Sequence, residues 1–122
     1  IKIGDGVFVN RNVFIDSKGG VTLGHGVALA EDVRIFTHNH GEASHIERTY
    51  QPVVVGDYAK VYSGAVLFPG VTVGRQAIVA AGSLVVHDVP ENTVVAGRPA
   101  KVLRERRAEG REGDELDHIW LF

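Results

Sequence analysis

The sequence predicts a single all-β domain in which short strands wind into a stack of triangular coils. Three observations lead to this fold class. Twelve Ile, Leu or Val residues recur every six positions in three phased blocks. A small residue stands four positions after most of them, and Gly or Asp often follows them directly. A period of six matches neither an α-helix nor a plain alternating strand, but it suits one side of a three-sided coil.

The bulky positions mark the coils from the N-terminus onward. The sequence places them at Ile3, Val9 and Ile15, then at Leu23, Leu29 and Ile35, and finally at Val55, Val61, Leu67, Val73, Val79 and Val85. Ten of the twelve residues that stand four positions later are Ser, Ala or Val, so a large and a small side chain share the inside of each unit. Twelve units make about four coils, which strands about 4.8 Å apart would stack to about 19 Å. The alternative, a sandwich of hairpins, would need a period of two.

Gly and Asp follow the bulky residues at the points where a coil must turn. Examples are Gly4-Asp5-Gly6, Gly24-His25-Gly26 and Gly56-Asp57. These residue types tolerate the tight backbone of a corner. Two extra residues stand near Lys18-Gly19-Gly20, which indicates one widened corner.

A larger break in the period follows Ile35. One continuous coil takes 18 positions, but Val55 lies 20 positions after Ile35. Residues 41–54 have lost the period and have gathered charge. We expect a loop to leave the coils here, and loops on rigid scaffolds commonly carry function.

The coils are expected to end near residue 100, because two prolines and Gly97 interrupt the period after Val85. The sequence thus predicts a coiled β domain over residues 1–100 and a C-terminal capping segment and tail over residues 101–122. Residues 100–107 are expected to form a short basic helix or strand. Unpaired strand edges and apolar flat sides also favour oligomerisation.

Composition argues against several classes of partner. The net charge of −2 offers no general attraction to nucleic acid or to an anionic membrane surface. The absence of cysteine rules out disulfides, thiolate metal sites and a cysteine nucleophile. No apolar run approaches the roughly 20 residues of a membrane span, and no signal-peptide pattern opens the sequence. These features favour a soluble, cytoplasmic protein.

Histidine is the residue type best suited to chemistry in this chain. Four of the six histidines lie between residues 25 and 45. A neutral imidazole is an effective general base near pH 7. His25 and His87 stand at predicted corners, where a solvated side chain is the simpler expectation.

The stretch Ile35-Phe36-Thr37-His38-Asn39-His40 resembles the Ile-x-Thr-x-x-His stretch of the maltose and galactoside acetyltransferases. These enzymes belong to the hexapeptide-repeat acyltransferases, whose fold is a left-handed parallel β-helix. The resemblance implies that handedness, which the period alone does not give. It also implies that His40 is the catalytic base, with His38 as the rival under a looser match.

The resemblance covers about residues 8–107 and implies further site residues. The stretch Phe8-Val9-Asn10-Arg11-Asn12 is similar to the family's aromatic-x-Asn-x-Asn stretch, which implies that Asn10 contacts the acceptor. The alternative is a corner Asn that bonds only its own backbone. Asp16 lies in the region of the family's acceptor-binding carboxylates, although the spacing is altered. His38 is expected beside the acceptor too.

Cofactor contacts are implied by three later stretches, which match family segments that bind acetyl-CoA as co-substrate. Ser63 stands where the family contacts the thioester end, and Ala81 and Gly82 stand where small residues line the pantetheine arm. Lys101 and Arg104 stand where basic residues face the phosphates of CoA.

The sequence departs from the family pattern at two positions that bear on the site. Lys60 replaces a Trp that usually precedes the Ser63 stretch. Thr49 precedes Tyr50 where the maltose and galactoside enzymes have a Glu that orients the base. Glu42 or Glu47 could take over that orienting role.

The resemblance predicts an acetyl-CoA-dependent O-acetyltransferase that acts on a hydroxyl of a sugar or similar small molecule, by direct transfer within a homotrimer. No metal is expected. One alternative is a metal hydratase like the γ-class carbonic anhydrases, but the expected second histidine after His25 is Ala30. His40 and His45 have the required interval but straddle the loop. The other alternative is a non-catalytic β-helix used for assembly.

Overall fold

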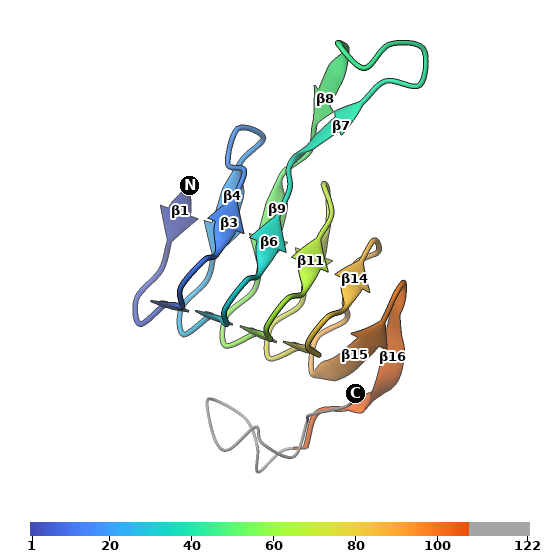
Figure 1. The fold of residues 1–122 in the computed structure, drawn as a ribbon. Helices are drawn as coiled ribbons and strands as arrows, with labels where there is room; N and C mark the ends of the chain where they lie inside the picture. Colours follow the sequence, from blue (N-terminus) through green and yellow to red (C-terminus); the bar gives the residue numbers. More distant parts are fainter. Residues whose placement is uncertain (108–122) are drawn as a thin grey trace.

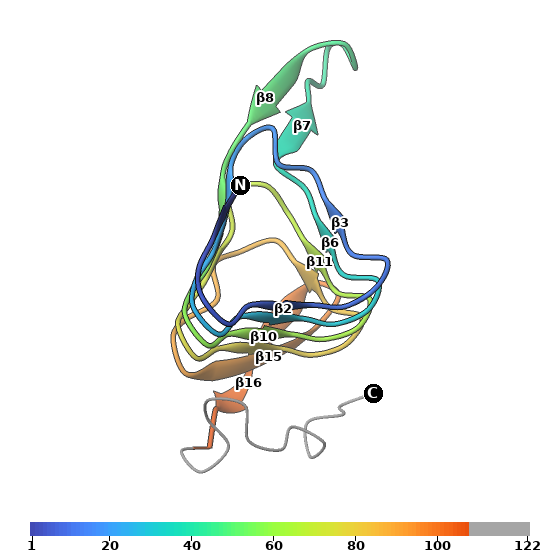
Figure 2. The same ribbon diagram turned by 90° about the vertical axis from the view of Figure 1, so that its left-hand side faces the viewer.

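A computed structural model describes residues 1–107, and every regular element in that range is a β-strand. The chain winds into stacked triangular coils, which are seen from the end in Figure 2. Parallel strands from successive coils form three sheets, one on each side of the triangle. No helix in this range is long and apolar enough to cross a membrane.

Each side of the triangle is one sheet. The first face consists of β1 (Lys2–Ile3), β4 (Val21–Leu23), β9 (Val53–Val55) and β12 (Thr72–Val73). The second face consists of β2 (Phe8–Val9), β5 (Ala28–Leu29), β10 (Lys60–Val61), β13 (Ile78–Val79), β15 (Thr93–Gly97) and β16 (Ala100–Glu105). The third face consists of β3 (Phe14–Ile15), β6 (Arg34–Ile35), β11 (Val66–Leu67) and β14 (Leu84–Val85).

The periodic residues form the core, as the sequence predicts. From the second coil onward all the bulky positions are buried, and the small residues four positions later are buried with them. Their strands are in register, so that Leu23 stacks on Val55 and Leu29 on Val61. In the first coil the inward positions Ile3 and Val9 are 56% and 44% exposed, because within residues 1–107 a coil covers them on one side only.

The corners explain why small residues follow the bulky ones. A Cβ built on Gly24 would lie 2.8 Å from the backbone nitrogen of Asp57 in the next coil, which leaves no room for a side chain. Two residues further around each turn the backbone enters the left-handed region, at Asp32, Tyr58 and Gln76 among others. The close stacking of coils at their corners therefore selects the Gly and polar pattern.

The excursion from the coils is a β-hairpin, which we call the arm, and Figure 1 shows it projecting beyond the stack. It is formed by β7 (His38–His40) and β8 (Arg48–Tyr50), which pair antiparallel. Its bounds differ from the expected loop over residues 41–54. The chain leaves after Thr37 and has returned by Val53, whose amide donates to the Gly20 carbonyl at 3.0 Å. Val53 is an inward core residue, so burial ends the excursion earlier than the lost period suggested.

The C-terminal segment of the described chain is a strand and not a helix. β16 turns back along β15 as its antiparallel partner, with a register shift at Val94 and Val95. Beyond it, the Arg106 side chain is buried, and its guanidinium donates to the carbonyls of Tyr58 at 3.3 Å and Gln76 at 3.0 Å. Arg106 thus fastens the segment to the corners of two coils. The expected tail over residues 108–122 lies outside the described residues.

Candidate functional site

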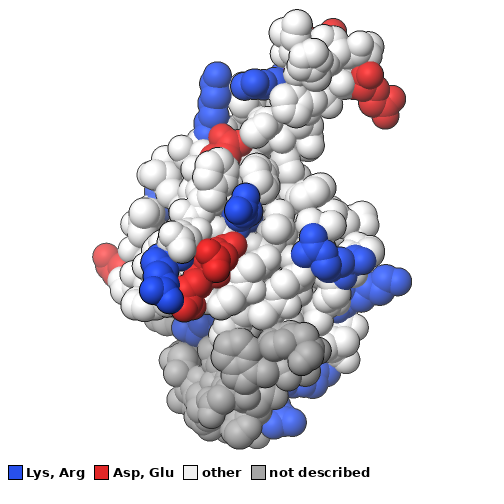
Figure 3. All heavy atoms as spheres, in the orientation of Figure 1, with Lys and Arg blue, Asp and Glu red and all other residues white. Residues whose placement is uncertain are grey.

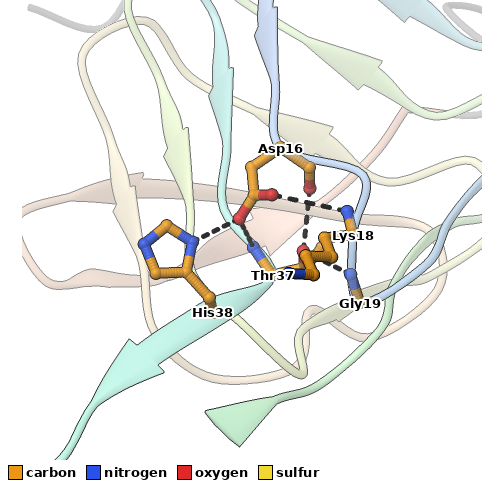
Figure 4. A network of polar contacts seen from close by, with 5 residues as sticks. All are labelled: Asp16, Lys18, Gly19, Thr37 and His38. Atoms are coloured by element: carbon orange, nitrogen blue, oxygen red, sulfur yellow. Dashed lines mark hydrogen bonds and ion pairs between the residues drawn. The ribbon is translucent and has the colours of Figure 1, made fainter. Parts of the chain in front are cut away.

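A network of polar contacts lies where the third face ends and the arm begins (Figure 4). Asp16 follows β3, and Thr37 follows β6 one coil later. The Thr37 amide donates to Asp16 Oδ2 at 3.1 Å, and the Thr37 hydroxyl donates to the Asp16 carbonyl at 2.8 Å. The Gly19 amide donates to that hydroxyl at 2.9 Å, which ties the widened corner to the same residue. The root of the arm is therefore held by hydrogen bonds from two coils.

Asp16 holds His38 in a defined orientation. The Asp16 carboxylate contacts Nδ1 of His38, and both side chains are largely shielded from solvent. The hydrogen bond with His38 is the main cause that lowers the pKa of Asp16 from 3.8 to about 2, and the amides of Thr37 and Lys18 add to it while burial opposes it. Because the carboxylate is charged at neutral pH, it can only accept, so Nδ1 of His38 carries hydrogen. In the neutral ring the lone pair then lies on Nε2.

His40 is oriented by the backbone of the arm. Its Nδ1 lies 2.6 Å from the carbonyl oxygen of His45 across the tip of the hairpin. A carbonyl only accepts hydrogen bonds, so this nitrogen donates, and Nε2 of the neutral ring bears the lone pair of a general base. The side chain is exposed, and its ring lies edge-on to that of His38 with centroids 5.3 Å apart. Positions 38 and 40 share one face of the strand.

The orienting group of His40 is therefore a main-chain carbonyl. The sequence suggested Glu42 or Glu47 for this role, in place of the family's Glu before the Tyr. In the structure Thr49 pairs with Asn39 across the arm, and Glu47 contributes its carbonyl to the Gly41 amide at 2.9 Å. The role of His45 was missed because a backbone acceptor leaves no signal in the residue pattern.

The predicted cofactor residues Ser63, Ala81 and Gly82 lie at another corner, between the second and third faces. The Gly82 amide donates to the Ser63 carbonyl at 2.9 Å, so the two residues stack on successive coils. Two residues that sequence reasoning missed join them. Glu31 lies one coil earlier with Oε1 3.5 Å from the Ser63 hydroxyl, and the Arg98 guanidinium donates to the Gly82 carbonyl at 2.8 Å.

The corner that contains Ser63, Ala81 and Gly82, which we call the open corner, leaves room for an extended ligand. A Cβ built on Gly82 would meet no heavy atom within 4 Å, so it would project into open space beside the backbone. The corner at Gly24, by contrast, is filled by the next coil. This open backbone leaves space for the pantetheine chain that the resemblance implies here, since such an extended chain must lie close to backbone amides.

The other predicted residues occupy separate positions. The side-chain oxygen of Asn10 accepts a hydrogen bond from the Arg11 amide at 2.8 Å, which is the backbone contact considered as the alternative. The side-chain nitrogen of Asn10 takes no part in that bond. Lys101 is exposed on β16, and Arg104 is half-buried there with its guanidinium on the Glu105 carbonyl at 2.9 Å. Both stand on the last strand of the second face.

Within one chain, His38 and His40 lie apart from the predicted cofactor residues Ser63 and Gly82. The histidines follow third-face strand β6, whereas Ser63 and Gly82 precede third-face strands β11 and β14. About six residues of extended chain at roughly 3.3 Å each separate these corners, so they lie up to about 20 Å apart. Between them, the face seen in Figure 3 carries interspersed acidic and basic side chains.

Comparison with known proteins identifies the fold and its family. No family model matches the chain. It is 33% identical over 109 residues to the galactoside O-acetyltransferase of Escherichia coli K12, a match that covers 86% of this chain and 54% of that protein. It is 34% identical over 118 residues to the serine acetyltransferase of Bacillus licheniformis, which covers 97% of this chain and 54% of that protein.

A solved structure agrees with these relatives. A hexapeptide-repeat-containing acetyltransferase from Vibrio cholerae, solved with acetyl coenzyme A, superposes with a TM-score of 0.83 at 33% identity, over 86% of this chain and 60% of that one. The predicted all-β, left-handed parallel β-helix is confirmed. The chain belongs to the hexapeptide-repeat acetyltransferases. It spans 54% to 60% of the length of these three proteins.

Proposed function

We propose that the protein is an acetyl-CoA-dependent O-acetyltransferase that acetylates a hydroxyl of a sugar or similar small molecule, with His40 as general base. The observation that carries the proposal is the orientation of His40. Its Nδ1 faces the His45 carbonyl at 2.6 Å, which leaves Nε2 exposed and able to accept a proton. The relatives named above transfer acetyl groups, and this supports the reaction class.

The proposed reaction needs one proton acceptor and no covalent enzyme intermediate. Bound acetyl-CoA supplies an activated acetyl thioester. His40 Nε2 accepts the proton of the acceptor hydroxyl as its oxygen attacks the acetyl carbon, and then returns that proton to the departing thiolate sulfur. A donor near Ser63 stabilises the negative charge that develops on the carbonyl oxygen. His38, held by Asp16, lies on the same side of the arm and contacts the acceptor.

The separation of the two corners supports a site that is shared between chains. Since His40 and Ser63 of one chain stand at opposite ends of the third face, the proposed site forms between copies, with the arm of one chain over the open corner of the next. We expect a homotrimer, the assembly that the resemblance implies, and a closed ring of this kind joins unlike surfaces of identical chains.

The proposed reaction is tested by acetyl-CoA turnover over a panel of acceptors, with CoA thiol release as the readout. We expect the His40→Ala protein to lose about 10²-fold to 10⁴-fold in kcat/KM, the usual contribution of a general base. The His38→Ala protein serves as the matched control and should lose less. CoA binding measured by calorimetry should persist in both. Equal activity of wild type and His40→Ala would refute the role of His40.

The shared site is tested by mixing two inactive variants. His40→Ala removes the base, and Ala81→Trp blocks the open corner without altering the arm. Co-refolding equal amounts should restore about a quarter of wild-type activity, because half of the arms and half of the corners are intact. A site within one chain would give no recovery.

Two alternatives remain distinguishable by experiment. Within residues 1–107 of one chain, no three His, Asp or Glu side chains are grouped to hold a metal ion, so nothing there favours a metal hydratase over a transferase. Metal analysis of purified protein tests that alternative directly. A purely structural β-helix would fail to bind acetyl-CoA in the calorimetric experiment.

A further inference from the structure

The outer side of the second face contains a depression of about 170 Å³, whose lining includes neither His40 nor Ser63 and Gly82. It arises because Ala28 on β5 lies between Phe8 on β2 and Lys60 on β10 in the strand register. Small residues on the middle strand, between larger ones above and below, create the hollow. Its volume is close to the roughly 150 Å³ of an engineered cavity that holds benzene, so it suits a single six-membered ring.

The depression combines an apolar lining with one cation. Asn10 and Lys60 supply polar groups, and the remaining lining residues are Phe8, Ala28, Ala30, Val61 and Tyr62. Phe8 is 59% exposed and offers an apolar wall. Asn10 is the residue expected to contact the acceptor, and Lys60 stands where the family usually has a Trp. By the strand spacing, their strands lie about 10 Å apart, which a substituted sugar can span.

Lys60 has no anionic partner among residues 1–107. Its ammonium donates to the Gly26 carbonyl at 3.3 Å, and no carboxylate of that range lies within 4.0 Å. The side chain is half-buried, and burial, followed by the positive charge of Arg106, lowers the pKa of Lys60. A charged group that is partly removed from water beside a second cation is unfavourable until an anion joins it.

We propose that this depression binds an acidic acceptor sugar, with Lys60 on its carboxylate or phosphate and Asn10 on a hydroxyl. The inference rests on the proposed acetyl transfer for the role of the sugar as acceptor, but binding to the depression stands independently of it. Asn10 keeps both amide N–H groups available to donate, since its bond with Arg11 uses the side-chain oxygen. An ammonium at this point favours an anionic sugar over a neutral one, because it can form a charge-assisted hydrogen bond with the anion only.

The first experiment measures binding without turnover. The ¹³C-labelled methyl groups of Ala28 and Ala30 are followed by NMR during titration with galacturonate, galactose 6-phosphate and galactose. We expect saturable shifts with one or both acidic sugars, at least about tenfold weaker binding of galactose, and loss of the difference in Lys60→Met. Lys60→Arg keeps the charge and should keep the preference, and unchanged methyl dispersion reports that both variants fold.

The responses to the three sugars distinguish the possible occupants of the depression. A response to galacturonate alone assigns a carboxylate, and a response to galactose 6-phosphate alone assigns a phosphate. Shifts that follow protein concentration and not added sugar would mean that a second copy of the chain covers Lys60, and this would overturn the proposal. Equal shifts with all three sugars, or none, would also overturn it.

The second experiment links the depression to the reaction. The ratio of kcat/KM for the preferred acidic sugar to that for galactose should fall at least about tenfold in Lys60→Met and be retained in Lys60→Arg. Methyl shifts without acetylation of any sugar would refute the proposed function while leaving the anion site in place. Acetylation with an unchanged ratio in Lys60→Met would refute the acidic-acceptor proposal while leaving the transferase in place.

Discussion

The coils and the arm are built on opposite principles, although they are neighbours in the chain. In the coils the inward side chains stack on the equivalent positions of neighbouring coils, and residues such as Leu29 and Ile35 are fully buried. The arm is a two-stranded hairpin whose residues are mostly exposed, and Ile46 at its tip is 78% exposed. Two isolated strands are marginal in water. The comparison teaches that the fold is stabilised in one region while the proposed chemistry is placed in the other.

The contacts at the root of the arm join these two regions. Thr37 is the last buried residue before the arm, and its carbonyl accepts from the Gln51 amide at 2.9 Å where the chain returns. The ammonium of Lys18 lies 5.3 Å from the ring centroid of Tyr50, which places the widened corner against β8. These contacts with the coils thus fix the direction in which the arm projects.

The sharpest test of this contrast makes the same substitution in both regions. Ile35→Ala leaves a cavity in the stacked core and should lower the free energy of unfolding by about 2–5 kcal/mol. Ile46→Ala at the tip of the arm should change it by less than about 0.5 kcal/mol. Urea denaturation followed by circular dichroism measures both. Similar losses would show that the arm contributes to the cooperative core.

A second test examines the hydrogen bonds of Arg106 at the C-terminal end of the coils. Arg106→Met removes a buried guanidinium that donates to the carbonyls of Tyr58 and Gln76, and should cost about 1.5–3 kcal/mol. Arg107→Met, at the exposed neighbouring position, is the control and should stay within about 0.5 kcal/mol. The urea midpoints of the two variants decide whether the hydrogen bonds of Arg106 stabilise the stacked coils.

The third test uses acid to separate the root of the arm from the coils. Because the pKa of Asp16 is lowered to about 2, its carboxylate adds stability that is fully present above pH 5 and is lost as the pH falls toward 2. Asp16→Asn should therefore be less stable than wild type by about 1 kcal/mol at pH 7, and the difference should shrink toward pH 2. Unfolding measured across this range checks the sign. A difference that grows in acid would contradict the assignment.

The smallest expected effect concerns the contact between Lys18 and Tyr50. Lys18→Met removes the cation and should leave global stability within about 0.5 kcal/mol, since an exposed cation–π contact contributes little. Amide hydrogen exchange of the arm, at residues 38–50, should nevertheless become faster. Exchange of the Leu29 and Val61 amides in the coils serves as the internal reference and should not change. Uniform acceleration of both would mean that the arm and the coils open together.

Prediction from sequence succeeded in the coils, where the six-residue period determines which side chains are buried. A repeated bulky and small pair can be buried only by stacking identical units, so the positions of Leu23, Val55 and Val73 and the glycines at the corners were evident in advance. It was less complete where contacts are made by the backbone. The bounds of the arm depended on whether Val53 entered the core, and the strand of residues 100–105 depended on the partner that β15 offered.

The sequence by itself determined the triangular coils, because they follow from residue types at fixed intervals, and its resemblance to the hexapeptide-repeat acetyltransferases nominated His40. Only the tertiary structure decided that Asp16 holds His38, that the His45 carbonyl orients His40, and that His40 and Ser63 occupy different corners. It also decided that Lys60 meets Ala28 and Asn10 around one depression. The physical reason is that these contacts join coils far apart in sequence, and the distance between them is set by stacking and register, which the periodic pattern does not record.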